Sequence, residues 1–127
     1  MIDILFYIQL ASGLTATTYG HGSMNCGDIG KPVACALGAV TASGEPFDPE
    51  LATAAVFAPT NLRMRPHHLL LKIVGPFRCH KIRINDKGNP RFIGKRSYDL
   101  TPAAIRKLGG RVSKHWSRGV ELCTTTG

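Results

Sequence analysis

The sequence predicts a mainly β domain with one or two short helices, and three observations indicate this class. Ile82 and Ile84 alternate with polar residues across 80–85, which is the period of a strand with one buried face. The next stretch, Asn-Asp-Lys-Gly-Asn-Pro at 85–90, has the composition of a turn. The chain also contains 14 glycines and 43% hydrophobic residues in 127, which suits one compact, turn-rich domain.

The N-terminal residues 1–13 form an extension before the predicted domain, which spans 14–123. Their apolar run is too short to cross a bilayer, and no other segment is long enough, so we expect no membrane span. Two interpretations of this extension stay open. It is either the remnant of a signal peptide or an extra strand or short helix. Asp3 and the lack of basic residues at the start count against a signal peptide. In either case the first barrel strand is expected at 14–19. The tail 124–127 is expected to fray.

The next part of the chain is predicted to be mostly loop and then helix. Residues 20–44 hold six glycines, and a loop of this length in a small domain is usually functional or cross-linked. Asp48 can cap the N-terminus of a helix, and Pro49 suits the first helical position. The sequence therefore predicts a short helix over 49–55.

The apolar run at 67–74 predicts a strand that turns at 75–77 and returns along 80–85 as a hairpin. Asp86 is expected where this second strand ends in a loop.

A helix is predicted over 102–108, because Thr101 suits an N-cap and a proline follows it. Two glycines at 109–110 end it. Val112 and the segment 119–122 are predicted to be closing strands.

The cysteines, Cys26, Cys35, Cys79 and Cys123, are even in number, which favours two disulfides and an oxidising compartment. The simplest pairing is Cys26–Cys35 and Cys79–Cys123, although four cysteines permit three pairings. Free buried thiols are the alternative. A metal site is not expected, because the chain has no Cys-x2-Cys pair and no tight Cys/His cluster.

Positive charge is concentrated in one part of the chain. The formal net charge is +8, and 15 of the 16 Lys and Arg residues lie between Arg63 and Arg118, where Asp86 and Asp99 are the only acids. Such a surface attracts polyanions such as nucleic acid, anionic lipid or an acidic cell wall; scattered solvating charges are the alternative. Aromatic residues make up 7% and are not interleaved with the basic ones, which argues against nucleic acid.

Several segments together resemble the rare lipoprotein A family of double-psi β-barrels, which is similar to the barrels of expansins and barwin. They are "TATTYG" at 15–20, "TASGEPFDPELATAA" at 41–55, "RINDKG" at 83–88 and "YDLTPAAIRKLG" at 98–109. The resemblance covers about residues 14 to 122. It implies a six-stranded double-psi β-barrel, acting as a monomer outside the cytoplasm, in the periplasm or secreted.

The resemblance also implies an activity and a partner. Rare lipoprotein A proteins are lytic transglycosylases that cut the glycan strands of peptidoglycan, whereas expansins loosen walls without hydrolysis. A lytic transglycosylase needs one acid, whose carboxylate then accepts a proton from the sugar's 6-hydroxyl, and it needs no cofactor. We therefore expect a barrel that either cleaves or only binds cell-wall glycan.

Three carboxylates are candidates for catalysis. Asp86 matches the Asp of the family's "RINDRG" motif; its alternative role is an Asx-type turn bond. Asp99 matches the Asp of the expansin "HFD" motif. Alternatively, its negative charge stabilises the following helix by lying near the positive, N-terminal end of the helix dipole. Glu45 matches the Glu of "GERFD", or is a surface carboxylate. The expected glycan-binding residues are Tyr19, His21, Arg83, Asn85 and Lys87.

Two features count against catalysis. Family members carry a His eleven residues after the Glu, and this chain has Val56 there. The cations Lys81, Arg83 and Lys87 would lower the pKa of Asp86, whereas a general acid needs a raised pKa, so desolvation would have to outweigh them. The alternative function is therefore a non-catalytic protein-binding module, such as a secreted protease inhibitor or a defence or effector protein.

Overall fold

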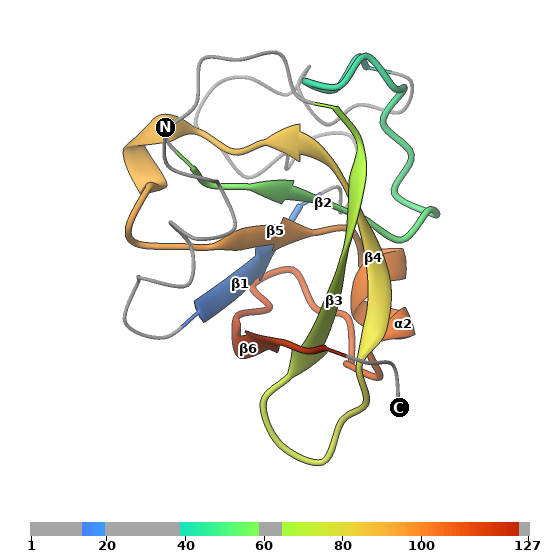
Figure 1. The fold of residues 1–127 in the computed structure, drawn as a ribbon, viewed down its shortest axis with the longest axis vertical. Coiled ribbons are helices and arrows are strands. Elements are labelled where there is room, and N and C mark those ends of the chain that lie inside the picture. The colour runs from blue at the N-terminus through green and yellow to red at the C-terminus, as the bar shows by residue number, and fades with distance from the viewer. Residues whose placement is uncertain (1–13, 20–38, 59–64, 125–127) are drawn as a thin grey trace.

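The computed structural model describes residues 14–19, 39–58 and 65–124, and these form a closed β-barrel with short helices (Figure 1). The strands are β1 (Leu14–Thr18), β2 (Thr53–Val56), β3 (His67–Ile73), β4 (His80–Lys87), β5 (Tyr98–Leu100) and β6 (Arg118–Leu122). The helices are the 3₁₀ turn η2 (Pro90–Phe92) and the α-helix α2 (Pro102–Lys107). The predicted mainly β class is confirmed.

The strand order around the barrel is β1-β5-β2-β4-β3-β6, and β6 pairs with β1 to close it. The pairs β1·β5 and β2·β4 are parallel, and the other four are antiparallel. Strands far apart in the sequence therefore lie side by side. The six strands agree with the predicted number, and the double-psi character of the barrel stays a prediction.

The barrel interior is filled by alternate residues of the strands. In the β3–β4 hairpin, Leu71, Ile73, Ile82 and Ile84 are at most 1% exposed, and the alternation in the sequence predicted this for Ile82 and Ile84. Burying one such side chain contributes about 1.5–3 kcal/mol to folding, so these positions define the register of the hairpin. The same core contains residues of every other strand and of α2: Ala16, Ala54, Val56, Tyr98, Leu100, Ala104, Ile105, Leu108 and Val120.

Helix α2 begins and ends where the sequence predicted, to within a residue. The buried Thr101 side chain accepts a hydrogen bond from Ala104 N (3.2 Å) and donates one to Leu51 O (2.7 Å). Gly109 has a φ of +89°, the left-handed conformation that glycine adopts readily after a helix. The N-cap thus also fastens α2 to the segment that leads into β2.

The helix predicted over 49–55 is wrong. Asp48 does cap a turn, because Glu50 N donates to Asp48 Oδ1 at 2.9 Å and Leu51 N to Asp48 O at 3.1 Å. The chain then enters β2, whose four residues are all buried. Both faces of β2 are covered, so its composition does not alternate and resembles that of a buried helix.

Three further boundaries differ from the prediction. Val112 lies in no strand, so the barrel is closed by β6 alone. The three-residue strand β5 was not predicted. Asp86 lies within β4, which continues to Lys87, rather than in the following loop, because its backbone pairs with β2.

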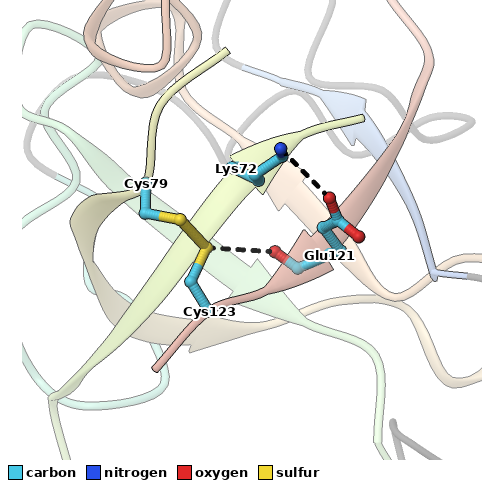
Figure 2. Close-up of a disulfide and its surroundings, with 4 residues drawn as sticks. All are labelled: Lys72, Cys79, Glu121 and Cys123. Atoms are coloured by element: carbon cyan, nitrogen blue, oxygen red, sulfur yellow. Dashed lines mark hydrogen bonds and ion pairs between the residues drawn. A yellow bond between two sulfur atoms is a disulfide. The ribbon is translucent and has the colours of Figure 1, made fainter. Parts of the chain in front are cut away.

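A disulfide joins Cys79, just before β4, to Cys123, just after β6, as predicted (Figure 2). Their Cα atoms are 6.3 Å apart, within the usual range for a disulfide. Lys72 Nζ lies 3.3 Å from Glu121 Oε1 on the adjoining strands. Cys26 and Cys35, like His21, the extension 1–13 and tail residues 125–127, lie outside the described residues. Neither described helix is long and apolar enough to cross a membrane.

Candidate functional site

A register shift in β4 determines from which face of the barrel wall the Asp86 side chain projects. Ala54 pairs with Ile84, but Ala55 pairs with Asp86, so Asn85 is an extra residue opposite β2. Such a bulge re-aims the side chains that follow it. Ala54 and Ile84 lie in the barrel core, whereas Ala55 packs on the opposite face. The bulge therefore places Asp86 level with Ala55 on the outer face, where strict alternation after Ile84 would have turned it inward.

Asp86 and Asp99 flank the same small residue. Ala55 pairs with Asp86 of β4 on one side and with Asp99 of β5 on the other. Residues paired in this way project from the same face. The two aspartates are thus two strand spacings apart, about 10 Å between backbones. Ala55 itself is buried, and it clusters on this face with Tyr19 and Phe47.

Asp99 is held by the neighbouring strand. Thr17 of β1 is its register partner, and Thr17 Oγ1 donates to Asp99 Oδ1 at 3.0 Å. This bond orients the Asp99 carboxylate. The structure therefore places Asp99 in a strand beside Asp86, not at the start of α2.

Asp86 combines burial with two backbone donors. Its Oδ1 accepts from Ala42 N and from Lys87 N, each at 2.9 Å. Burial raises the pKa of Asp86, and the two N–H bonds and the charge of Lys87 oppose this without reversing it. Of the three cations expected to lower this pKa, only Lys87 acts on it. Desolvation is therefore the dominant effect at this carboxyl.

Tyr19 lies close to both aspartates. Its ring packs against Phe47 with centroids 5.1 Å apart, and its backbone N donates to Leu100 O at 3.1 Å. The pKa of Tyr19 is raised well above its ordinary value by burial first, then by the charges of Asp86 and Asp99. Tyr19 is thus a neutral phenol whose buried hydroxyl keeps its proton.

Within the described part of the chain, three buried oxygens of this region have no hydrogen-bond partner: Tyr19 Oη, Thr53 Oγ1 and Asn85 Oδ1. The Thr53 hydroxyl is near enough to Tyr19 to oppose the rise of its pKa, but not in hydrogen-bond geometry. Buried polar groups are nearly always hydrogen-bonded in folded proteins, so these three oxygens are candidates to bind a polar ligand. A fourth oxygen of this kind, Tyr98 Oη, belongs to a core residue, and burial raises the pKa of Tyr98.

Glu45 is engaged by Arg83. Arg83 Nε lies 3.0 and 3.1 Å from the two carboxylate oxygens, and Nη2 lies 2.6 Å from Oε2. These bonds are the main cause of the lowered pKa of Glu45. The charges of the pair therefore compensate each other. The catalytic role predicted for Glu45 would require this carboxylate to leave Arg83, and it stays a prediction.

The other predicted residues divide between the site and its surroundings. Asn85 forms the bulge, and Lys87 ends β4 opposite Val56. Val56, at the position where the resembled family has a His, is 1% exposed within the barrel core. Its side chain thus points away from the face of Asp86.

Sequence reasoning missed Ala55, Thr53 and Thr17, which complete the face around the aspartates. An alanine between two carboxylates has no signature in a single sequence, because the three lie on separate strands. The only local signal is the run of small residues at 52–55.

No group of three or more His, Cys, Asp or Glu side chains within residues 14–19, 39–58 and 65–124 is arranged to hold a metal ion. A scan against protein-family models finds no match to this chain, and a search of curated proteins finds no similar sequence.

Proposed function

We propose that this barrel binds the glycan strands of peptidoglycan and cleaves them as a lytic transglycosylase, outside the cytoplasm. The observation that carries the proposal is the state of Asp86. The bulge turns it to the outer face, burial raises its pKa, and both backbone donors bind Oδ1. Oδ2 is therefore left to carry a proton, which is what a general acid requires.

The reaction uses this one carboxyl twice. Asp86 donates its proton to the glycosidic oxygen as the bond from that oxygen to the anomeric carbon breaks. The resulting carboxylate then accepts the proton of the sugar's 6-hydroxyl, whose oxygen bonds to the anomeric carbon and forms an anhydro ring. No water is consumed, and Asp86 regains its proton. General acid–base catalysis of this kind contributes about 10²–10⁴-fold to the rate.

The surrounding groups supply sugar recognition. Among the described residues, no hydrogen-bond partner is found for Tyr19 Oη and Thr53 Oγ1, which can donate and accept, or for Asn85 Oδ1, which can accept. Sugar hydroxyl and acetamido groups carry the complementary hydrogen-bonding atoms. Asp99 is oriented by Thr17 and lies about two strand spacings from Asp86. It is therefore positioned to accept a hydrogen bond from a second hydroxyl of the sugar.

A barrel that binds glycan without cleaving it is the second candidate. The observation in its favour is that Val56 is buried in the core where the resembled family has a His. No described His is among the groups that shift the pKa of Asp86. The Cys79–Cys123 disulfide is compatible with either function in an oxidising compartment.

The test is a digest of purified peptidoglycan sacculi incubated with the protein and analysed by mass spectrometry. Anhydro-sugar fragments are expected. Retention on sacculi without such fragments would select the binding function, and neither retention nor fragments would overturn the proposal. Retention is expected to weaken at molar salt, because the exposed basic side chains meet an acidic polymer whose attraction salt screens.

A further inference from the structure

Cationic side chains gather on the outer face of the β3–β4 hairpin, away from the Asp86 carboxyl. His68 of β3 pairs with Arg83 of β4, and Lys81 lies two residues before Arg83 on the same strand. Because side chains alternate along a strand, these three project from one face. The intervening residues, Leu69, Leu71, Ile82 and Ile84, belong to or pack against the barrel core.

Helix α2 adds a fourth cation to this face. Lys107 Nζ donates to Lys81 O at 2.8 Å, which fixes the lysine ammonium beside the edge of β4. Partial desolvation lowers the pKa of His68, and the charges of Arg83, Lys81, Lys107 and His67 lower it further, in that order. His68 therefore lies within electrostatic reach of cations on β3, β4 and α2.

Negative charge near this cluster is almost absent. Glu45 is the described carboxylate that acts on His68, and it is occupied by its two-pronged contact with Arg83. Among the described residues, Lys81 and Lys107 pair with no carboxylate. Like charges held together without a counter-charge favour binding of an anion, which would lower their mutual repulsion.

We propose that His68, Lys81 and Lys107 form an oxyanion-binding site that holds phosphate or carboxylate groups of a wall polymer, and that His68 takes up a proton when the anion binds. Two ammonium groups and an imidazolium match the donors that such anions accept. An anion beside His68 favours its charged form, so binding strengthens as the pH falls through the titration range of His68. This anion site depends on the proposed function in one respect only, which is that the wall polymer supplies the anion.

The experiment is an NMR titration of the imidazole signals of the intact protein with inorganic phosphate, and separately with citrate, at fixed ionic strength. Saturating phosphate is expected to raise the pKa of His68 measurably. Lys81→Gln and Lys107→Gln should each weaken phosphate binding about three- to tenfold. Lys95→Gln is the matched control, because Lys95 is an equally exposed lysine whose charge does not act on His68.

Glu45→Gln provides a test in the opposite direction. Removing this carboxylate releases Arg83 to the anion, so phosphate binding should strengthen. An unchanged His68 signal at saturating phosphate would overturn the proposal. So would a loss in Lys95→Gln as large as that in Lys81→Gln, because the attraction would then be diffuse.

Retention and cleavage assays with sacculi distinguish this inference from the proposed function and identify the source of the anion. If phosphate binds as expected but sacculi are neither retained nor cleaved, the anion site stands and the proposed function fails. If sacculi are cleaved and phosphate does not bind, the proposed function stands and the anion site fails. Loss of retention after chemical removal of wall phosphate would assign the anion to phosphate, whereas unchanged retention would assign it to carboxylates of the glycan.

Discussion

Arg83 Nη2 lies 2.6 Å from Glu45 Oε2, so the carboxylate that Arg83 pairs with is Glu45 and not Asp86. Arg83 is three residues before Asp86 in sequence and was expected to lower its pKa. Instead its charge is matched by Glu45, and burial dominates at Asp86. Burial thus explains why a carboxyl in a basic segment has a raised pKa. The ion pair with Arg83 explains why Glu45 itself is held in its charged form.

Asp86→Asn should stabilise the protein near pH 7. The folded-state pKa of Asp86 is raised above its unfolded value of about 4, so the charged carboxylate destabilises the folded state at pH values above both. The amide oxygen of Asn can still accept from Ala42 N and Lys87 N. The variant should need more urea to unfold at pH 7, and its advantage should shrink as the pH falls through the folded pKa of Asp86. A variant less stable than the parent at pH 7 would contradict this account.

Tyr19→Phe should separate stability from glycan binding. The change removes a buried hydroxyl that has no partner and keeps the ring contact with Phe47. The free energy of unfolding should rise by about 1 kcal/mol, because an unsatisfied buried polar group is costly. Retention on sacculi should fall, since the hydroxyl is assigned to the sugar. A loss of stability in urea titrations would show instead that the hydroxyl has a structural partner.

Gly88→Ala should destabilise the barrel end next to Asp86. A Cβ at Gly88 would overlap the ring of Phe57, whereas a Cβ at Gly119 would meet Val74 Cγ2 at an ordinary 3.5 Å. Forcing a side chain into such a packed position costs about 1–3 kcal/mol. Gly119→Ala is the control and should be nearly neutral. Equal effects of the two substitutions in chemical denaturation would refute the packing explanation.

The Cys79–Cys123 disulfide should contribute substantially to stability. It closes a loop with a sequence separation of 44 residues. Loop-closure entropy predicts a contribution of about 3–4 kcal/mol for a loop of this length. The double variant Cys79→Ala, Cys123→Ala should lose this amount in guanidinium unfolding while keeping its barrel circular dichroism at low temperature. A loss below about 1 kcal/mol would mean that the unfolded chain is hardly constrained by the bridge.

Local patterns predicted the elements that depend on local physics. The β3–β4 hairpin was found from the apolar run at 67–74 and from the alternation of Ile82 and Ile84 with polar residues. Helix α2 was found because Thr101 and Gly109 are typical cap residues. β2 was mistaken for a helix because Thr53–Val56 is buried throughout and rich in alanine. Its strand conformation depends on β4 and β5, which lie far away in sequence.

The site shows the same division. Asp86 and Asp99 were identified from short motifs, but their common face was not. It depends on the bulge at Asn85 and on the pairing of both with Ala55. The pair between Glu45 and Arg83 joins positions 38 residues apart, and no local signal predicts it. Non-local pairing thus determines the electrostatics that the sequence left open.

The central claim is that Asp86 is the catalytic acid, and two matched variants test it most directly. Asp86→Asn and Asp99→Asn each replace a carboxyl on the same face with a nearly isosteric amide, which cannot donate a proton to the glycosidic oxygen as a general acid. In a mass-spectrometric digest of sacculi, Asp86→Asn should release anhydro-sugar fragments about 10²–10⁴-fold more slowly than the parent, and Asp99→Asn should retain most of the rate. Loss of cleavage in Asp99→Asn with full activity in Asp86→Asn would contradict the account.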